Sequence, residues 1–95
     1  MSSEKYRQAI CSRVCKILQD ERVKRGISMT SLGVSTGLSQ QAISYVEREM
    51  RIPNLDTLLR ITGALKISLG DVINQAMREI STTLTGKNEK TTQPK

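Results

Sequence analysis

The side chains best suited to recognition chemistry lie in one short segment, residues 39–48. Placed around a helical wheel at about 100° per residue, this segment divides into two faces. One face is apolar and holds Ile43 and Val46. The opposite face offers two amides, a hydroxyl, a phenol and a guanidinium, from Gln40, Gln41, Ser44, Tyr45 and Arg48. These groups can hydrogen-bond to base edges or to phosphates, so the pattern is typical of a recognition helix.

The residues around this segment predict a second short helix and a tight turn. Ser28 and Ser39 each stand where a helix needs an N-cap, because a side-chain oxygen there can accept a first-turn N–H. Gly37 lies between them, and glycine tolerates the left-handed backbone that ends a helix and reverses the chain. Residues 28–48 therefore predict a helix-turn-helix.

Cys11 and Cys15 lie four residues apart on one helical face, which raises the question of a metal site or a redox pair. The chain has no His and no third Cys, so a four-ligand zinc site would need carboxylates or a second subunit. A cytosolic thiol pair is normally reduced, and a free Cys packs well as a small apolar side chain. We expect both cysteines to be packing residues, with no metal bound.

The sequence also lacks the residues from which common catalytic sites are built. There is no His, neither cysteine is near a candidate base, and the glycines match no phosphate-binding spacing. We therefore expect a protein that is not an enzyme, has no catalytic residues and needs no cofactor.

Length and composition predict one small helical domain. A chain of 95 residues buries only about 60 to 65% of its unfolded surface. Tyr6 and Tyr45 are its only aromatic residues, so the core must be aliphatic. Apolar residues recur at i, i+3 and i+4 throughout, which is the spacing of helices rather than strands.

The charge balance favours a polyanionic partner. The net charge is +6, although Lys87, Lys90 and Lys95 near the C-terminus supply part of it. No apolar run approaches the roughly 18 residues of a membrane span, and no signal peptide is recognisable. We expect a cytoplasmic protein with no membrane association.

Caps and apolar stripes predict the remaining helices. The first should cover residues 4–25 after the Ser3 cap, the fourth 55–66 after Asn54, and the fifth should begin after Ser68. The fold class is thus all-α, with a folded domain over residues 3–84. Residues 85–95 are polar and are expected to form a disordered tail.

The ordered set of motifs resembles the phage-repressor-like (Cro/C1, or XRE) helix-turn-helix regulators. The resemblance spans Leu18 to about Ile73 and rests on Leu18-x-x-x-Arg22-x-x-x-Gly26-Ile27-Ser28, Thr36-Gly37-Leu38-Ser39, Ile43-Ser44-Tyr45-Val46-Glu47-Arg48, Pro53 to Ile61, and Ala64 to Leu69. It implies a compact five-helix, lambda-repressor-like domain. The first and last helices would extend beyond the family's usual limits.

Roles for individual residues follow from their side-chain chemistry and position. For the Gln40–Gln41 pair and the Arg22–Glu47 pair, they are also what the resemblance implies. Base contacts fall to Gln40, Gln41 and Tyr45, with the alternative that the tyrosine ring lies on its own helix. Phosphate contacts fall to Ser39, Ser44, Arg48 and Arg51. In the family, the residues that match Arg22 and Glu47 form a partly buried ion pair, and we expect the same pair here. The alternative is that both side chains are solvated.

Three positions depart from the family pattern. Met29 stands where a glutamine often supports the recognition helix, so that support should be lost. Gly33 replaces a small alanine and preserves a close helix crossing. Glu49 replaces a glycine, which places a carboxylate near the DNA and a side chain where a left-handed residue is expected.

The apolar row of the last helix continues past the family's compact domain through Ala76, Met77 and Ile80. These residues can meet the extra turns of the first helix within one chain, or a second copy across a two-fold axis. We favour the second possibility and predict a homodimer.

Two functions remain open from the sequence. The first is a sequence-specific transcriptional regulator that binds a near-palindromic operator in double-stranded DNA, of phage-repressor, controller-protein or antitoxin type. The second is a protein-interaction module on the same scaffold, whose C-terminal helix engages a protein partner such as a toxin.

Overall fold

The chain folds into five α-helices, seen in a computed structural model that describes residues 3–89, with side-chain surroundings up to residue 82. No strand occurs among the described residues, and the predicted all-α, five-helix architecture is confirmed. In the same range, no helix has both the length and the apolar character that a membrane crossing requires. The helices are α1 (Glu4–Lys24), α2 (Met29–Thr36), α3 (Gln40–Glu47), α4 (Leu55–Leu65) and α5 (Leu69–Glu89).

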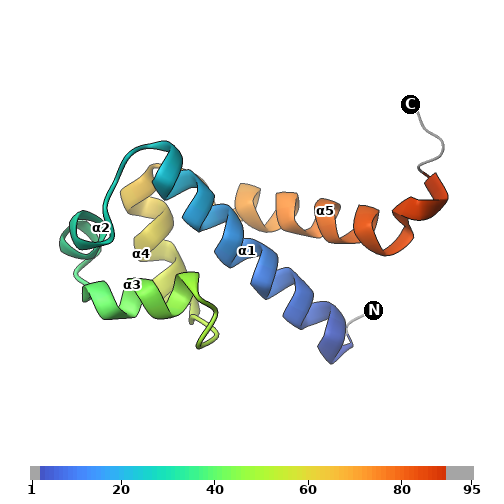
Figure 1. Ribbon diagram of the computed structural model, residues 1–95, viewed down its shortest axis with the longest axis horizontal. Helices are drawn as coiled ribbons and strands as arrows, with labels where there is room; N and C mark the ends of the chain where they lie inside the picture. The colour runs from blue at the N-terminus through green and yellow to red at the C-terminus, as the bar shows by residue number, and fades with distance from the viewer. Residues whose placement is uncertain (1–2, 90–95) are drawn as a thin grey trace.

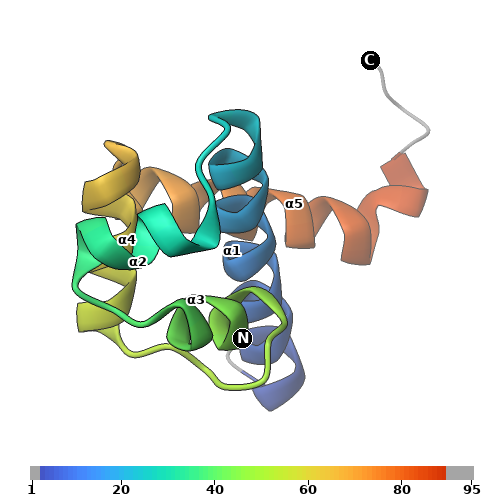
Figure 2. The same ribbon diagram turned by 60° about the vertical axis from the view of Figure 1, so that its left-hand side comes forward.

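The three short helices gather at one end of the long helix α1 (Figure 1). Helix α2 contacts both α3 and α4, and α1 contacts α3, α4 and α5. The turned view shows α2 and α3 side by side, with a loop carrying the chain from α3 to α4 (Figure 2). Helices α1 and α5 pack together, and their far ends diverge toward the two termini (Figure 1).

The predicted N-caps begin the helices as expected. Ser3, Ser28, Ser39 and Asn54 each accept a backbone N–H from the residue three positions later. Ser68 accepts the Asp71 N–H at 3.3 Å at the start of α5. Each cap satisfies one of the first-turn donors that a helix leaves without a partner.

The helix ends differ slightly from the prediction. Gly26 and Gly37 adopt the predicted left-handed conformation, with φ of +69° and +78°. Helix α1 ends one residue early, at Lys24. Helix α4 ends at Leu65 because Lys66 itself turns left-handed, with φ of 60°.

Helix α5 is longer than the sequence predicts. Its last turns cover residues 85–89, which the prediction placed in the disordered tail. Helical backbone hydrogen bonds can continue through polar residues once a helix is nucleated, so loss of the apolar pattern did not mark its end. The rest of the predicted tail, residues 90–95, lies outside the described residues.

The core is aliphatic, as the composition requires. Ile43 on α3, Leu65 on α4 and Ala76 on α5 are all fully buried. Around them lie the other buried members of one cluster, which are Val14, Cys15, Leu18, Leu32, Val46, Ile61 and Val72. Every helix contributes to this cluster, so α3 is anchored to the whole domain.

The contact between α1 and α5 determines how much of the apolar row formed by Ala76, Met77 and Ile80 is exposed. Ala76 is 0% exposed and Ile80 is 9% exposed within the single chain. Beside them, Arg13 of α1 forms an ion pair with Glu79 of α5, with 3.3 Å between Nε and Oε1. Two of the three residues assigned to dimerisation are therefore covered by their own chain, and only Met77 stays exposed, at 41%.

The α2–α3 turn depends on a very close backbone approach. A Cβ added to Gly33 would lie 2.7 Å from the carbonyl oxygen of Leu38, nearer than real Cβ atoms come to such a group. The alanine usual at this position would therefore not fit the turn as it stands. Gly33 is thus required here, and not merely an acceptable small residue.

A buried ion pair joins α1 to α3. Arg22 Nε lies 2.5 Å from Glu47 Oε2, and Arg22 Nη2 lies 3.0 Å from Glu47 Oε1. The remaining guanidinium nitrogen, Nη1, donates to the carbonyl of Ile27 at 2.7 Å. The two side chains are only 11% and 6% exposed, so they are not solvated, and the expected ion pair is present.

Removal of Arg22 should strongly destabilise the domain. Arg22→Ala leaves the Glu47 carboxylate buried without its partner, and we expect a loss of about 3 to 5 kcal/mol in unfolding free energy. The matched control is Arg25→Ala, which breaks the more exposed pair with Glu21 and should cost under about 1 kcal/mol. Denaturant melts measure both. Equal, small losses would contradict a structural role for the ion pair.

Substitution of Gly33 should also destabilise the domain, in spite of the higher helix propensity of alanine. Gly33→Ala forces the turn at Leu38 to move, at an expected cost of about 1 to 3 kcal/mol. Gly63→Ala on α4 is the control, because a Cβ there meets nothing within 4 Å. That variant should gain about 0.5 to 1 kcal/mol. A gain at both positions would show that the turn is not tightly packed.

Candidate nucleic-acid interface

Helix α3 presents the polar row that the sequence predicts. Gln40, Gln41 and Arg48 are exposed, and Ser44 and Tyr45 are half-buried. On the other side of the same helix, Ile43 and Val46 are 0% and 5% exposed. The core therefore fixes the rotation of α3, and this rotation turns the hydrogen-bonding groups toward solvent.

Ser39 begins this helix and is already engaged. Its hydroxyl accepts the N–H of Ala42 at 3.0 Å. The start of α3 lies beside α2, and helix N-termini carry backbone N–H groups and a partial positive charge suited to phosphate. Ser39 therefore stands at a place where an anion would bind favourably.

Gln40 is supported from α2, although Met29 makes no hydrogen bond to it. The Met29 side chain packs against the core. The next residue, Thr30, donates its hydroxyl to Gln40 Oε1 at 3.2 Å. The support that a glutamine would have given thus comes from a threonine one position later, a contact that sequence comparison with the family did not suggest.

Tyr45 lies along its own helix, which is the alternative considered for it. Gln41 Nε2 donates to the Tyr45 hydroxyl at 2.6 Å. The guanidinium carbon of Arg51 lies 5.1 Å from the centre of the tyrosine ring, within the range of a cation–π contact. Gln41, Tyr45 and Arg51 thus form a connected group on the exposed side of α3 and its following loop.

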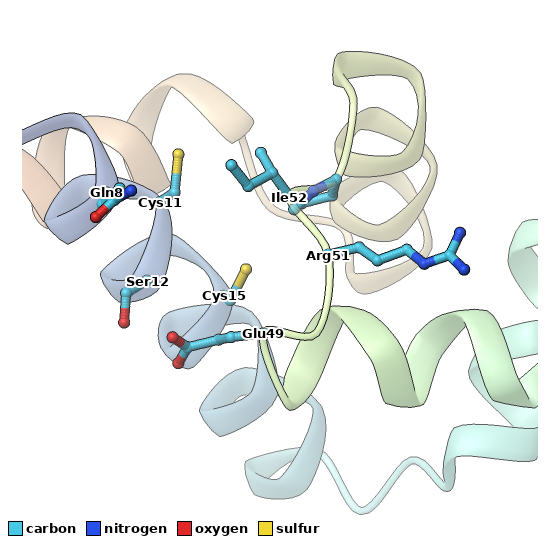
Figure 3. Close-up of a pocket in the computed structure, with 8 residues that line it drawn as sticks. Gln8, Cys11, Ser12, Cys15, Glu49, Arg51 and Ile52 are labelled. Atoms are coloured by element: carbon cyan, nitrogen blue, oxygen red, sulfur yellow. The ribbon is translucent and has the colours of Figure 1, made fainter. Parts of the chain in front are cut away.

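Glu49 does not extend along the polar face of α3. Its backbone is left-handed, with φ of 58°, as expected for the position of a family glycine. Its carboxylate points back toward α1, near Ser12 and Cys15, while Arg51 extends in the opposite direction (Figure 3). The Glu49 carboxylate is thus directed toward α1 (Figure 3), and the expectation that it lies near the DNA stays a prediction.

The Glu49 side chain lines a cavity of about 210 Å³ between α1 and the loop after α3, together with Cys11, Cys15 and Ile52. Cys15 is 3% exposed. Burial, and then the nearby Glu49 carboxylate, raise the pKa of the Cys15 thiol to about 11. The thiol therefore stays protonated at neutral pH and packs as an apolar group.

Arg60 was missed by sequence reasoning, although it holds the turn in place. Its Nη1 donates to the carbonyl of Thr36 at 2.9 Å, at the end of α2, and its Nε pairs with Asp56 on its own helix. The spacing of Asp56 and Arg60 indicates a local helix pair, but not a contact 24 residues away in the chain.

A helix-turn-helix family model matches residues 18–72, which is more than half of the chain. The chain belongs to this XRE-type, phage-repressor-like helix-turn-helix family. Members of the helix-turn-helix family bind DNA and regulate transcription, and the chain is a DNA-binding transcription regulator of this type. No curated protein matches it significantly.

Solved structures agree with the family assignment. The chain is 25% identical to a mutant of the restriction-modification controller protein C.Esp1396I, with a TM-score of 0.69 over 77% of this chain and 95% of that one. It is 32% identical to the P22 c2 repressor in complex with a synthetic operator, with a TM-score of 0.57 over 62% and 89% of the two chains. The clp gene regulator ClgR from Corynebacterium glutamicum shares the fold, at 19% identity and a TM-score of 0.71 over 83% and 84%.

The left-handed backbone at Glu49 predicts that a glycine at this position would stabilise the protein. A left-handed backbone costs a non-glycine residue about 1 kcal/mol, so Glu49→Gly should raise the unfolding free energy by about that amount. Glu49→Gln removes the charge and keeps the backbone cost, so it should give no comparable gain. Denaturant melts of both variants separate the two causes. An equal gain for the two would assign the effect to charge.

Proposed function

We propose that the protein is a sequence-specific regulator that binds a near-palindromic operator as a homodimer, with α3 in the major groove. The observation that carries this proposal is the exposed row of hydrogen-bonding side chains on α3, held by a buried face and a buried ion pair. The P22 c2 repressor, which resembles this chain, is described in complex with an operator. A role on DNA also agrees with the expected cytoplasmic location.

The polar side chains on and beside α3 would make two kinds of contact with DNA. Gln40 and Gln41 at the start of α3 read base edges, because an amide can pair bidentately with adenine. Ser39, Ser44, Arg48 and Arg51 address phosphates, which positions the domain but carries little sequence information. The protein thus acts by binding, with no catalytic step.

Substitutions on α3 should separate these two kinds of contact. The Gln40→Ala, Gln41→Ala double variant should lose about 10- to 100-fold in preference for the operator over a scrambled duplex, with an unchanged salt slope. Arg48→Ala should weaken binding to both duplexes and reduce the slope of log K against log salt by about 1. Fluorescence anisotropy at four salt concentrations measures both effects. If the double variant keeps its full preference, the glutamines do not read the bases.

The homodimer needs a surface that a single chain leaves exposed. Met77 is the one residue of the predicted α5 set that qualifies. A larger exposed apolar set, which we call the loop–α4 surface, consists of Ile52, Leu55 and Leu59, at 73%, 62% and 52% exposure. Leu55 and Leu59 are four residues apart on one face of α4 and close to the loop that follows α3.

Two charge substitutions should identify the dimer surface. Leu59→Glu should convert a dimer to a monomer, because a carboxylate would be buried in the contact. Met77→Glu, at the edge of the α1–α5 pair, should leave the mass unchanged if the loop–α4 surface is used. Sedimentation equilibrium at several concentrations measures the mass. If only Met77→Glu loses the dimer, the dimer forms through α5 and not through the loop–α4 surface.

A second candidate function uses the same apolar residues. The exposed side chains of the loop–α4 surface and Met77 would also suit a protein partner, as proposed for the C-terminal helix of an interaction module. This alternative predicts no preference for any duplex sequence. The polar row on α3 gives the regulator proposal more support, since docking surfaces are rich in apolar anchors.

A further inference from the structure

The two glutamines of α3 are exposed, yet neither amide is without a protein partner. A free glutamine side chain on a helix surface samples many rotamers, and fixing it on binding costs up to about 2 kcal/mol. A side chain that is held before binding avoids much of this cost and presents its donors and acceptor in a set direction.

We propose that two residues that do not themselves read bases orient these amides: Thr30 on α2 positions Gln40, and the Tyr45 hydroxyl positions Gln41. The inference rests on the proposed function and reassigns Tyr45 from a base contact to a positioning residue. Each amide would therefore have its preferred base edge determined by one hydrogen bond inside the protein.

The contact from Thr30 leaves Gln40 able to read a base. The threonine hydroxyl uses one lone pair of Gln40 Oε1, at 3.2 Å. The second lone pair and both N–H groups of Nε2 remain available, which is what pairing with the N6 and N7 edge of adenine requires. Since Thr30 lies in the first turn of α2, the hydrogen bond also ties the two helices of the motif together at their reading end.

The contact from Tyr45 acts in the same way on Gln41. The Gln41 amide donates one N–H to the Tyr45 oxygen at 2.6 Å, which leaves one N–H and the carbonyl oxygen for a base. The tyrosine ring is itself held by the Arg51 guanidinium, 5.1 Å from its centre. Arg51 therefore contributes to orientation in addition to its proposed phosphate contact.

The experiment measures base preference one position at a time. The full-length protein is bound to its selected operator and to every single base-pair substitution within one half-site, with each duplex tested at two salt concentrations. The variants are Thr30→Val, which keeps the shape and removes the hydroxyl, Thr30→Ser, which restores it, and Tyr45→Phe, which keeps the ring under Arg51. Gln40→Ala and Gln41→Ala identify the base pair that each glutamine reads, and Ser35→Ala removes another exposed hydroxyl from α2 as a control.

We expect Thr30→Val to lose about three- to tenfold in discrimination at the base pair identified by Gln40→Ala and at no other. Thr30→Ser should recover the discrimination. Tyr45→Phe should lose a similar factor at the base pair identified by Gln41→Ala. Salt slopes and thermal midpoints should stay unchanged, which a general loss of structure would not allow.

Other outcomes overturn the inference in distinguishable ways. Unchanged discrimination in both variants means that the hydrogen bonds do not orient the amides. A loss in Tyr45→Phe at a base pair of its own assigns the tyrosine to direct contact. If the unmodified protein prefers no sequence, the proposed function fails as well.

Discussion

The Arg22–Glu47 ion pair is the interaction on which the geometry of the interface depends. It joins the long helix α1 to the last turn of the recognition helix and also holds the Ile27 carbonyl just before α2. Two charges taken out of water are favourable only when their hydrogen bonds are well satisfied, and here the guanidinium makes three. The pair thus adds a directional contact to the apolar packing of Ile43 and Val46, which also holds α3.

The remaining constraints act on the turn between α2 and α3. Gly33 permits the approach of the Leu38 carbonyl, Gly37 supplies the left-handed residue, and Arg60 holds the end of α2 from α4. With the turn fixed, Thr30 and Gln40 come within hydrogen-bonding distance. The arrangement of the interface therefore depends on contacts made by residues outside it. Its side chains are oriented by hydrogen bonds although they remain exposed.

Much of this structure could be predicted from local sequence signals. Caps such as Ser28 and Ser39 act on the next three residues, and Gly37 acts on its own backbone, so both can be identified without knowledge of the fold. The buried ion pair could be predicted only through the family resemblance, since nothing local in the sequence joins residues 22 and 47. The family match over residues 18–72 then confirmed the class of protein.

Contacts set by side-chain direction in three dimensions were harder to predict. The burial of Ala76 and Ile80 depends on the angle at which α1 crosses α5, which periodicity does not determine. Glu49 has a left-handed backbone and directs its carboxylate toward α1 (Figure 3), and the Thr30 contact needs the α2–α3 turn to be formed. Residues 85–89 are helical because the backbone hydrogen bonds of α5 continue beyond its last apolar residues.

Selection of binding sites from random duplex DNA at near-physiological salt tests whether this protein is a dimeric, sequence-specific regulator. We expect the protein to select a two-fold symmetric motif, with half-site centres about 34 to 36 Å apart along the DNA helix. Recovery of no enriched sequence from a protein that circular dichroism shows to be folded would contradict this expectation.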